Sequence, residues 1–135
     1  MDIKLYEDLY DALVEHNANS TQNYGNTIVH YPPSNPAYPL TVFREERNVA
    51  NVNYNGDLQR VSSVLYSVTV CAKTKGSTRK DAIARRCFEI ADELLSSVGL
   101  RRVSYNVFDI QDDGNIYMIT STYSGNFDEY RRRIL

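Results

Sequence analysis

The chain has 135 residues, of which 42% are hydrophobic and 24% charged, so it is long enough and apolar enough to fold as one domain with a sizeable core. Fifteen basic and seventeen acidic residues leave a net charge of −2, which argues against a protein that binds nucleic acid along its surface. No apolar run approaches the roughly 20 residues that cross a bilayer, and the N-terminal residues do not have the order of a signal peptide. Eleven tyrosines and no tryptophan suit both sheet faces and partly wetted protein interfaces.

The first half of the chain contains a predicted helix and two short predicted strands. Leucines recur every four residues over residues 3–16, which predicts the helix. Residues 24–31 and 40–44 are β-prone, and prolines make the segment between them an extended loop. Residues 45–63 are polar and rich in asparagine without periodicity, so we expect a mobile loop that becomes ordered against a partner.

The centre of the chain predicts a strand followed by a long helix. Apolar residues alternate over 64–72, which indicates a half-buried strand. The next apolar stripe has helical spacing over 78–98, with Thr78 as the expected N-cap and Gly99 as the expected left-handed C-cap.

The last third predicts a hairpin. Residues 102–110 and 115–123 alternate on either side of an Asp-Gly turn at 113–114, and Gly125 is expected to break the second strand. With too few crossover helices for a parallel sheet, we predict one α+β domain over residues 1–135. Its sheet should be mainly antiparallel, with one long helix packed on a face and a shorter N-terminal helix.

The sequence contains no recognisable catalytic or metal-binding pattern. His16 and His30 lie far apart, and Cys71 and Cys87 are predicted to be free buried thiols. There is no nucleophile elbow and no glycine-rich phosphate loop. We therefore expect no enzyme activity, no cofactor and no metal.

Arginine and lysine occur in doublets and one triplet. They lie at residues 79–80, 85–86, 101–102 and 131–133. For the last two groups, a solvated surface and salt bridges to neighbouring subunits remain equally good interpretations.

Several stretches, taken in order, resemble a known family. They are Tyr38-Pro39-Leu40-Thr41-Val42-Phe43-Arg44-Glu45, residues 48–53, residues 62–73, Gly99-Leu100-Arg101-Arg102, the Asp-Gly hairpin, residues 117–123 and Asn126-Phe127-Asp128. Over about residues 38–128 the chain resembles the small tail terminator (tail completion) proteins of long-tailed bacteriophages, often labelled minor capsid proteins. Leu100 and Cys71 depart from the pattern, because aromatic residues are common at both positions.

The resemblance implies a structural virion protein at the head-proximal end of the tail, made and assembled in the host cytoplasm. It would form a homohexameric ring that caps the tail tube, stops tube polymerisation and provides the docking face for the head connector. Implied partners are other copies, the tail tube protein, the head-closure or connector protein and the tape measure protein, with no membrane. DNA would pass through the lumen without specific binding. The alternative is a head-tail adaptor or a tail tube subunit of the same particle.

The predicted contacts to other subunits or to the tube come from the matching segments and from the arginine groups. They are Tyr38, Phe43, Arg44, Glu45, Arg101, Arg102, Arg131, Arg132 and Arg133.

Overall fold

Five strands and two helices form a two-layer α+β fold in the computed structural model, which describes residues 5–52, 60–111 and 115–128. The elements in chain order are α1 (Leu5–Asn19), β1 (Thr27–Val29), β2 (Leu40–Val52), β3 (Arg60–Ala72), α2 (Lys80–Ser97), β4 (Arg101–Ile110) and β5 (Ile116–Asp128). The strand order is β1-β2-β3-β5-β4, and every pair is antiparallel except β1 with β2. The predicted fold class is therefore confirmed, with α2 as the long helix and α1 as the shorter one. Among the described helices, none is long and apolar enough to cross a membrane.

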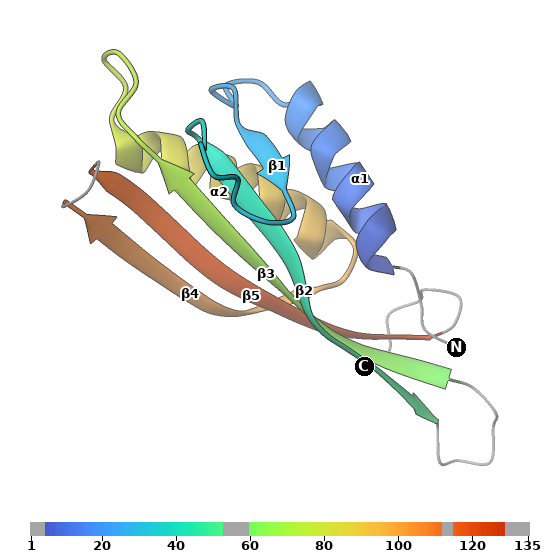
Figure 1. The fold of residues 1–135 in the computed structure, drawn as a ribbon. Coiled ribbons are helices and arrows are strands. Elements are labelled where there is room, and N and C mark those ends of the chain that lie inside the picture. Colours follow the sequence, from blue (N-terminus) through green and yellow to red (C-terminus); the bar gives the residue numbers. More distant parts are fainter. Residues whose placement is uncertain (1–4, 53–59, 112–114, 129–135) are drawn as a thin grey trace.

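Both helices pack on the same face of the sheet, and the core lies between the two layers (Figure 1). On β3, Val64, Tyr66, Val68 and Val70 are buried and alternate with partly exposed residues, as the period of two predicts. The leucines of the α1 stripe are buried as well. The periodicity of the sequence therefore predicted correctly which side chains of β3 and α1 face the core.

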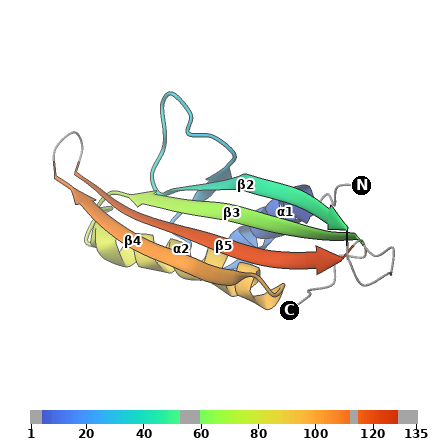
Figure 2. The same cartoon turned by 90° about the horizontal axis from the view of Figure 1, so that it is seen from below.

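The opposite face of the sheet is covered only in part. In Figure 2 the segment between β1 and β2 stands on the side of the sheet away from the helices. This proline-containing segment lies beside the start of β2, where Leu40 and Val42 are buried although their strand partners Cys71 and Thr69 are only partly so.

The predicted loop at residues 45–63 is wrong over much of its length. Residues 45–52, which we call the β2 arm, belong to β2, and residues 60–63 belong to β3. The β2 arm pairs with the first residues of β3, which also pair with the end of β5, and these strands extend past the helices (Figure 1). Residues 53–59 lie outside the described residues. The side chains of residues 44–47 on β2 are all exposed and polar, so no apolar alternation marked the strand. Whether this segment becomes ordered against a partner stays a prediction.

Two other local predictions are also wrong, and one is confirmed. Helix α2 starts at Lys80 with Arg79 as its N-cap and no side-chain capping bond, because the backbone of Thr78 pairs with that of Lys75 instead. Gly125 does not break the strand but lies inside β5, opposite Val64. Gly99 has the expected positive φ of 96° after the end of α2. The predicted turn at 113–114 lies outside the described residues.

Candidate functional site

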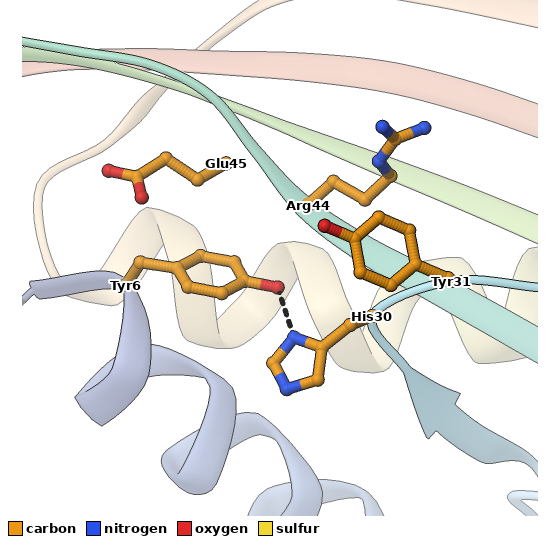
Figure 3. A pocket seen from close by; sticks show the side chains of 5 residues that line it. All are labelled: Tyr6, His30, Tyr31, Arg44 and Glu45. Atoms are coloured by element: carbon orange, nitrogen blue, oxygen red, sulfur yellow. Dashed lines mark hydrogen bonds between the residues drawn. The ribbon is translucent and has the colours of Figure 1, made fainter.

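Two hollows lie at the two sides of the sheet. The first, which we call the β2 pocket, has a volume of about 190 Å³ and is lined by Tyr6, His30, Tyr31, Arg44 and Glu45 (Figure 3). The second, which we call the β4 groove, has a volume of about 300 Å³ and is lined by Arg85, Phe88, Glu89, Arg102 and Tyr105. Each combines aromatic rings with arginine and a carboxylate. Aromatic residues and arginine are enriched at protein interfaces, whereas carboxylates are not.

The inner wall of the β2 pocket is a hydrogen-bonded pair from α1 and the end of β1. The Tyr6 hydroxyl donates to the backbone oxygen of Phe43 and lies 2.6 Å from His30 Nδ1 (Figure 3). A hydroxyl has a single proton to donate, so His30 Nδ1 must carry a hydrogen and donate it to the Tyr6 oxygen.

Stacked rings hold this wall in place. The His30 ring lies 3.7 Å from the Tyr10 ring at an interplanar angle of 13°, and the rings of Tyr6 and Phe43 are 5.1 Å apart. Burial raises the pKa of the Tyr6 hydroxyl to about 12, and neighbouring phenols and Glu45 add to the rise. At neutral pH Tyr6 is therefore an uncharged donor that positions the wall.

The outer rim of the β2 pocket is charged. The Arg44 guanidinium lies 5.3 Å from the centre of the Tyr31 ring, a cation–π arrangement. The Glu45 side chain is exposed, and within the described residues its carboxylate has no ion-pair partner.

A buried hydroxyl lies next to this rim. Tyr66 pairs with Glu45 across β2 and β3 and is fully buried, yet its hydroxyl has no hydrogen-bond partner among the described residues. Burial, together with the charge of Glu45, raises the pKa of Tyr66 and keeps it protonated. A buried hydroxyl of this kind costs about 1–3 kcal/mol when it is left unsatisfied.

The β4 groove is organised around Arg102. Its guanidinium lies 5.2 Å from the Tyr105 ring and 5.7 Å from the Phe88 ring. It also approaches Asp92, with 3.7 Å between Nη1 and Oδ1, and the Tyr123 hydroxyl donates to the same carboxylate oxygen at 2.6 Å. The ion pair is long and partly exposed, so Arg102 keeps donors available for a further acceptor.

Strand β4 exposes apolar side chains on both of its faces. Val103, Tyr105, Val107, Phe108 and Ile110 are 39–47% exposed. An irregularity between Arg102 and Ser104 removes Val103 from the simple alternation that the sequence predicts. Because β4 is the last strand of the sheet in the described part of the chain, this surface is continuous with a backbone edge that no other described strand pairs with.

The structure separates the predicted contact residues. Arg44 and Glu45 meet in the β2 pocket, whereas Arg102 lies in the β4 groove with Arg101 exposed beside it. Tyr38 belongs to neither hollow, since it is half-buried with the Lys73 ammonium 4.7 Å from its ring centre.

Phe43 requires a correction, and three predicted residues cannot be placed. Phe43 is 0% exposed, so its side chain supports the wall of the pocket and offers no surface to a partner. Arg131, Arg132 and Arg133 lie outside the described residues. For the exposed residues, a role in subunit or tube contacts stays a prediction.

The sequence did not indicate the aromatic residues of the two hollows. Tyr6 only widens the leucine stripe of α1, and Tyr105 belongs to an ordinary alternation on β4. The one available signal was the high tyrosine content, which suggests interfaces without locating them.

Within the described residues, neither the two cysteines nor the polar side chains near the last turn form a metal site. Cys71 and Cys87 are free, and Cys87 is buried whereas Cys71 is only partly so. The Lys80 ammonium lies 2.6 Å from Asp109 Oδ1 and 2.5 Å from Asn115 Oδ1. No group of three or more acidic, histidine or cysteine side chains in the searched residues could hold a metal ion.

A scan against protein-family models and a search of curated proteins each found no match for this chain. The functional argument therefore depends on its own residues and geometry.

Proposed function

We propose that this chain is a structural subunit at the head-proximal end of a bacteriophage tail, where six copies form a ring that caps the tail tube. The ring stops tube polymerisation and provides the docking face for the head connector. The observation that carries the proposal is a sheet with two edges that are open within the described residues, formed by strands that run antiparallel to each other. The ordered resemblance over about residues 38–128 supports the same conclusion.

The two edges are the outer sides of β4 and of the β2 arm. Strand β1 pairs only with Leu40–Val42, so from Arg44 onward the outer edge of β2 has no strand partner among the described residues. Unpaired edge backbone is a template for another strand. A chain with two such edges can bind one neighbour on each side.

The directions of these edges suit a closed ring. Three successive antiparallel pairings separate β2 from β4, so the two strands run antiparallel to each other. A copy rotated about an axis along the strands would present its β4 to β2 of the neighbour in antiparallel orientation. Such a contact is heterologous, and it closes into a ring when the rotation closes. Residues 106–108 of β4 are level with the part of β2 that β1 covers, so the strands must tilt relative to the ring axis for β4 to reach the open edge of β2. With that tilt the exposed apolar side chains of β4 would be covered.

The two central strands suit a passage for DNA. Residues 61–72 and 115–127, which include most of β3 and β5, contain no charged residue. Phosphate contacts by lysine and arginine supply most nonspecific DNA affinity. If the face away from the helices lines the lumen, DNA would slide past it without being held.

The test is the state of assembly and its effect on tube growth. Native mass spectrometry and negative-stain imaging of the purified chain should show a closed six-fold ring. Adding the chain to polymerising tail tube protein should stop elongation. A twelve-fold ring would instead indicate a head-tail adaptor, and a long tube would indicate a tube subunit. A strict monomer that leaves tube growth unchanged would refute the proposal.

A further inference from the structure

The helix layer ends before it covers β4. On the helix side of the sheet, Tyr105 of β4 pairs with Ser121 of β5. In the next row on this side, Val107 pairs with Ile119. The two β5 residues are 0% exposed, whereas Tyr105 and Val107 are 44% and 42% exposed. The core therefore ends at β5, and the β4 groove lies beside it, where adjoining apolar side chains are left open to a partner.

Two aromatic rings form the floor of the β4 groove. The centroids of the Phe88 ring on α2 and the Tyr105 ring on β4 are 5.2 Å apart, and the rings meet edge to face at 70°. Phe88 is 5% exposed, so Tyr105 offers most of the aromatic surface. The volume of about 300 Å³ is at the lower limit of pockets that hold a whole small-molecule ligand. The groove therefore suits one or two side chains of a peptide segment.

Two arginines flank these rings. Arg85 on α2 is exposed and has no ion-pair partner within the described residues. Arg102 lies 3.7 Å from Asp92, but the oxygen that it approaches already accepts the 2.6 Å hydrogen bond from the Tyr123 hydroxyl. A guanidinium has five N–H donors, so this single long ion pair leaves Arg102 able to bind a further anion.

The carboxylates near the groove leave one of these two charges uncompensated. The Glu89 carboxylate lies 3.6 Å from the guanidinium of Arg86, which does not line the groove, and it is not within ion-pair distance of Arg85. Asp92 offsets part of the charge of Arg102. Among the described residues, Arg85 has no such compensation, so the groove has a net positive charge.

We infer that the β4 groove binds an acidic segment of another protein, in which a carboxylate lies next to an aromatic or large aliphatic side chain. The apolar side chain rests on the Tyr105 ring, and the carboxylate pairs with the arginines at the sides of the groove. Arg102 is held over both rings before binding, which lowers the entropy that is lost when a partner binds. Charge complementarity thus selects an acidic segment over a neutral or basic one.

This inference goes beyond the ring of the proposed function and does not depend on it. In the ring, the contact is made by the backbone edge of β4, whereas the groove lies between β4 and α2. The β2 arm that would pair with this edge extends past the helices of its own copy (Figure 1), so it brings no helix over the groove. The neighbouring copy would cover β4 from its outer side and leave the space beside α2 open.

Binding of three short peptides, attached to a surface and followed by surface plasmon resonance, tests the inference. The acidic peptide Gly-Asp-Phe-Asp-Gly should bind at least about fivefold more tightly than its amide counterpart Gly-Asn-Phe-Asn-Gly, because only the first can form ion pairs. The ring-free peptide Gly-Asp-Gly-Asp-Gly should also bind at least about fivefold more weakly than the acidic peptide, because it leaves the aromatic floor uncovered.

Substitutions in the chain place the binding in the groove. Arg85→Gln should weaken binding of the acidic peptide by about threefold to fivefold and leave binding of the amide peptide unchanged. A general loss of structure would instead weaken both. Arg85→Lys keeps the charge and should lose less affinity than Arg85→Gln. The matched control is Arg79→Gln, because the Arg79 side chain is 82% exposed and does not line the groove, and it should leave binding unchanged.

Four results would overturn the inference. The first is an acidic peptide that binds no better than the amide peptide, and the second is binding that Arg85→Gln does not weaken. The third is equal binding of the ring-free peptide, which would indicate a simple anion site. The fourth is a ring that Arg85→Gln weakens in native mass spectrometry, which would show that a second copy fills the groove. None of these measurements involves tube growth, so the proposed function stands or fails separately.

Discussion

Replacing Gly125 with alanine should destabilise the protein, although alanine normally suits a strand interior better than glycine. An added Cβ would lie 2.8 Å from Phe127 Cε2 and 3.1 Å from Leu100 Cδ2. Phe127 is 1% exposed and Leu100 is 5% exposed, so neither side chain can move into solvent. The lower entropy of the unfolded chain would favour alanine by about 0.5–1 kcal/mol. Overpacking costs about 1–3 kcal/mol, so we expect a net loss of about 1–2 kcal/mol.

Urea unfolding followed by circular dichroism measures this loss, and a double-mutant cycle identifies its cause. Phe127→Leu removes the ring atoms that the new methyl group would meet. Gly125→Ala should therefore cost less in the Phe127→Leu background, by about 1 kcal/mol. Ser124→Ala, at the neighbouring position on the other face, is the matched control and should change stability by less than about 0.5 kcal/mol. A Gly125→Ala protein as stable as the original would refute the packing argument.

Three further predictions concern buried or charged polar groups. Asn26→Ala should lower the free energy of unfolding in urea by about 1–3 kcal/mol, because the amide oxygen of Asn26 accepts a 3.0 Å hydrogen bond from the buried Thr41 hydroxyl. A loss below about 0.5 kcal/mol would contradict this. Burial raises the pKa of the Cys87 thiol from 9.0 to about 12, so its contribution to stability is complete below pH 9 and is lost as the pH rises toward 12. The unfolding free energy should therefore fall over this interval, and less steeply in Cys87→Ala; equal slopes would disprove the assignment. Lys80→Met should cost about 1 kcal/mol or less at low salt and still less at high salt, since Asp109 is partly exposed; a salt-independent loss would point to packing instead.

Those elements whose burial is periodic could be predicted from the sequence. The leucines of α1 and the alternating residues of β3 each repeat with the period of one element that rests on the core. Gly99 was predictable for a related reason, since a helix end commonly needs a residue with positive φ. In these cases the residues within one element are enough to predict which side chains it buries or where it ends.

Other features were missed because distant residues decide them. Residues 44–47, where β2 enters the β2 arm, show no alternation, because their side chains are exposed on both faces. Gly125 looked like a strand breaker, but it pairs with Val64 inside β5, and Leu100 and Phe127 fill the space where its side chain would lie. The expected N-cap Thr78 was lost to a backbone pairing with Lys75.

The sequence by itself determined the α+β class and most of the helices and strands. It also placed arginine and glutamate near the ends of predicted strands. Only the tertiary structure decided which of them share a surface. The β2 pocket takes Tyr6 from α1, His30 and Tyr31 from the end of β1, and Arg44 and Glu45 from β2. Side-chain periodicity is a property of one segment, whereas strand order and register depend on which distant segments pair. That register, and nothing within either strand alone, sets Glu45 level with Arg102 across the sheet.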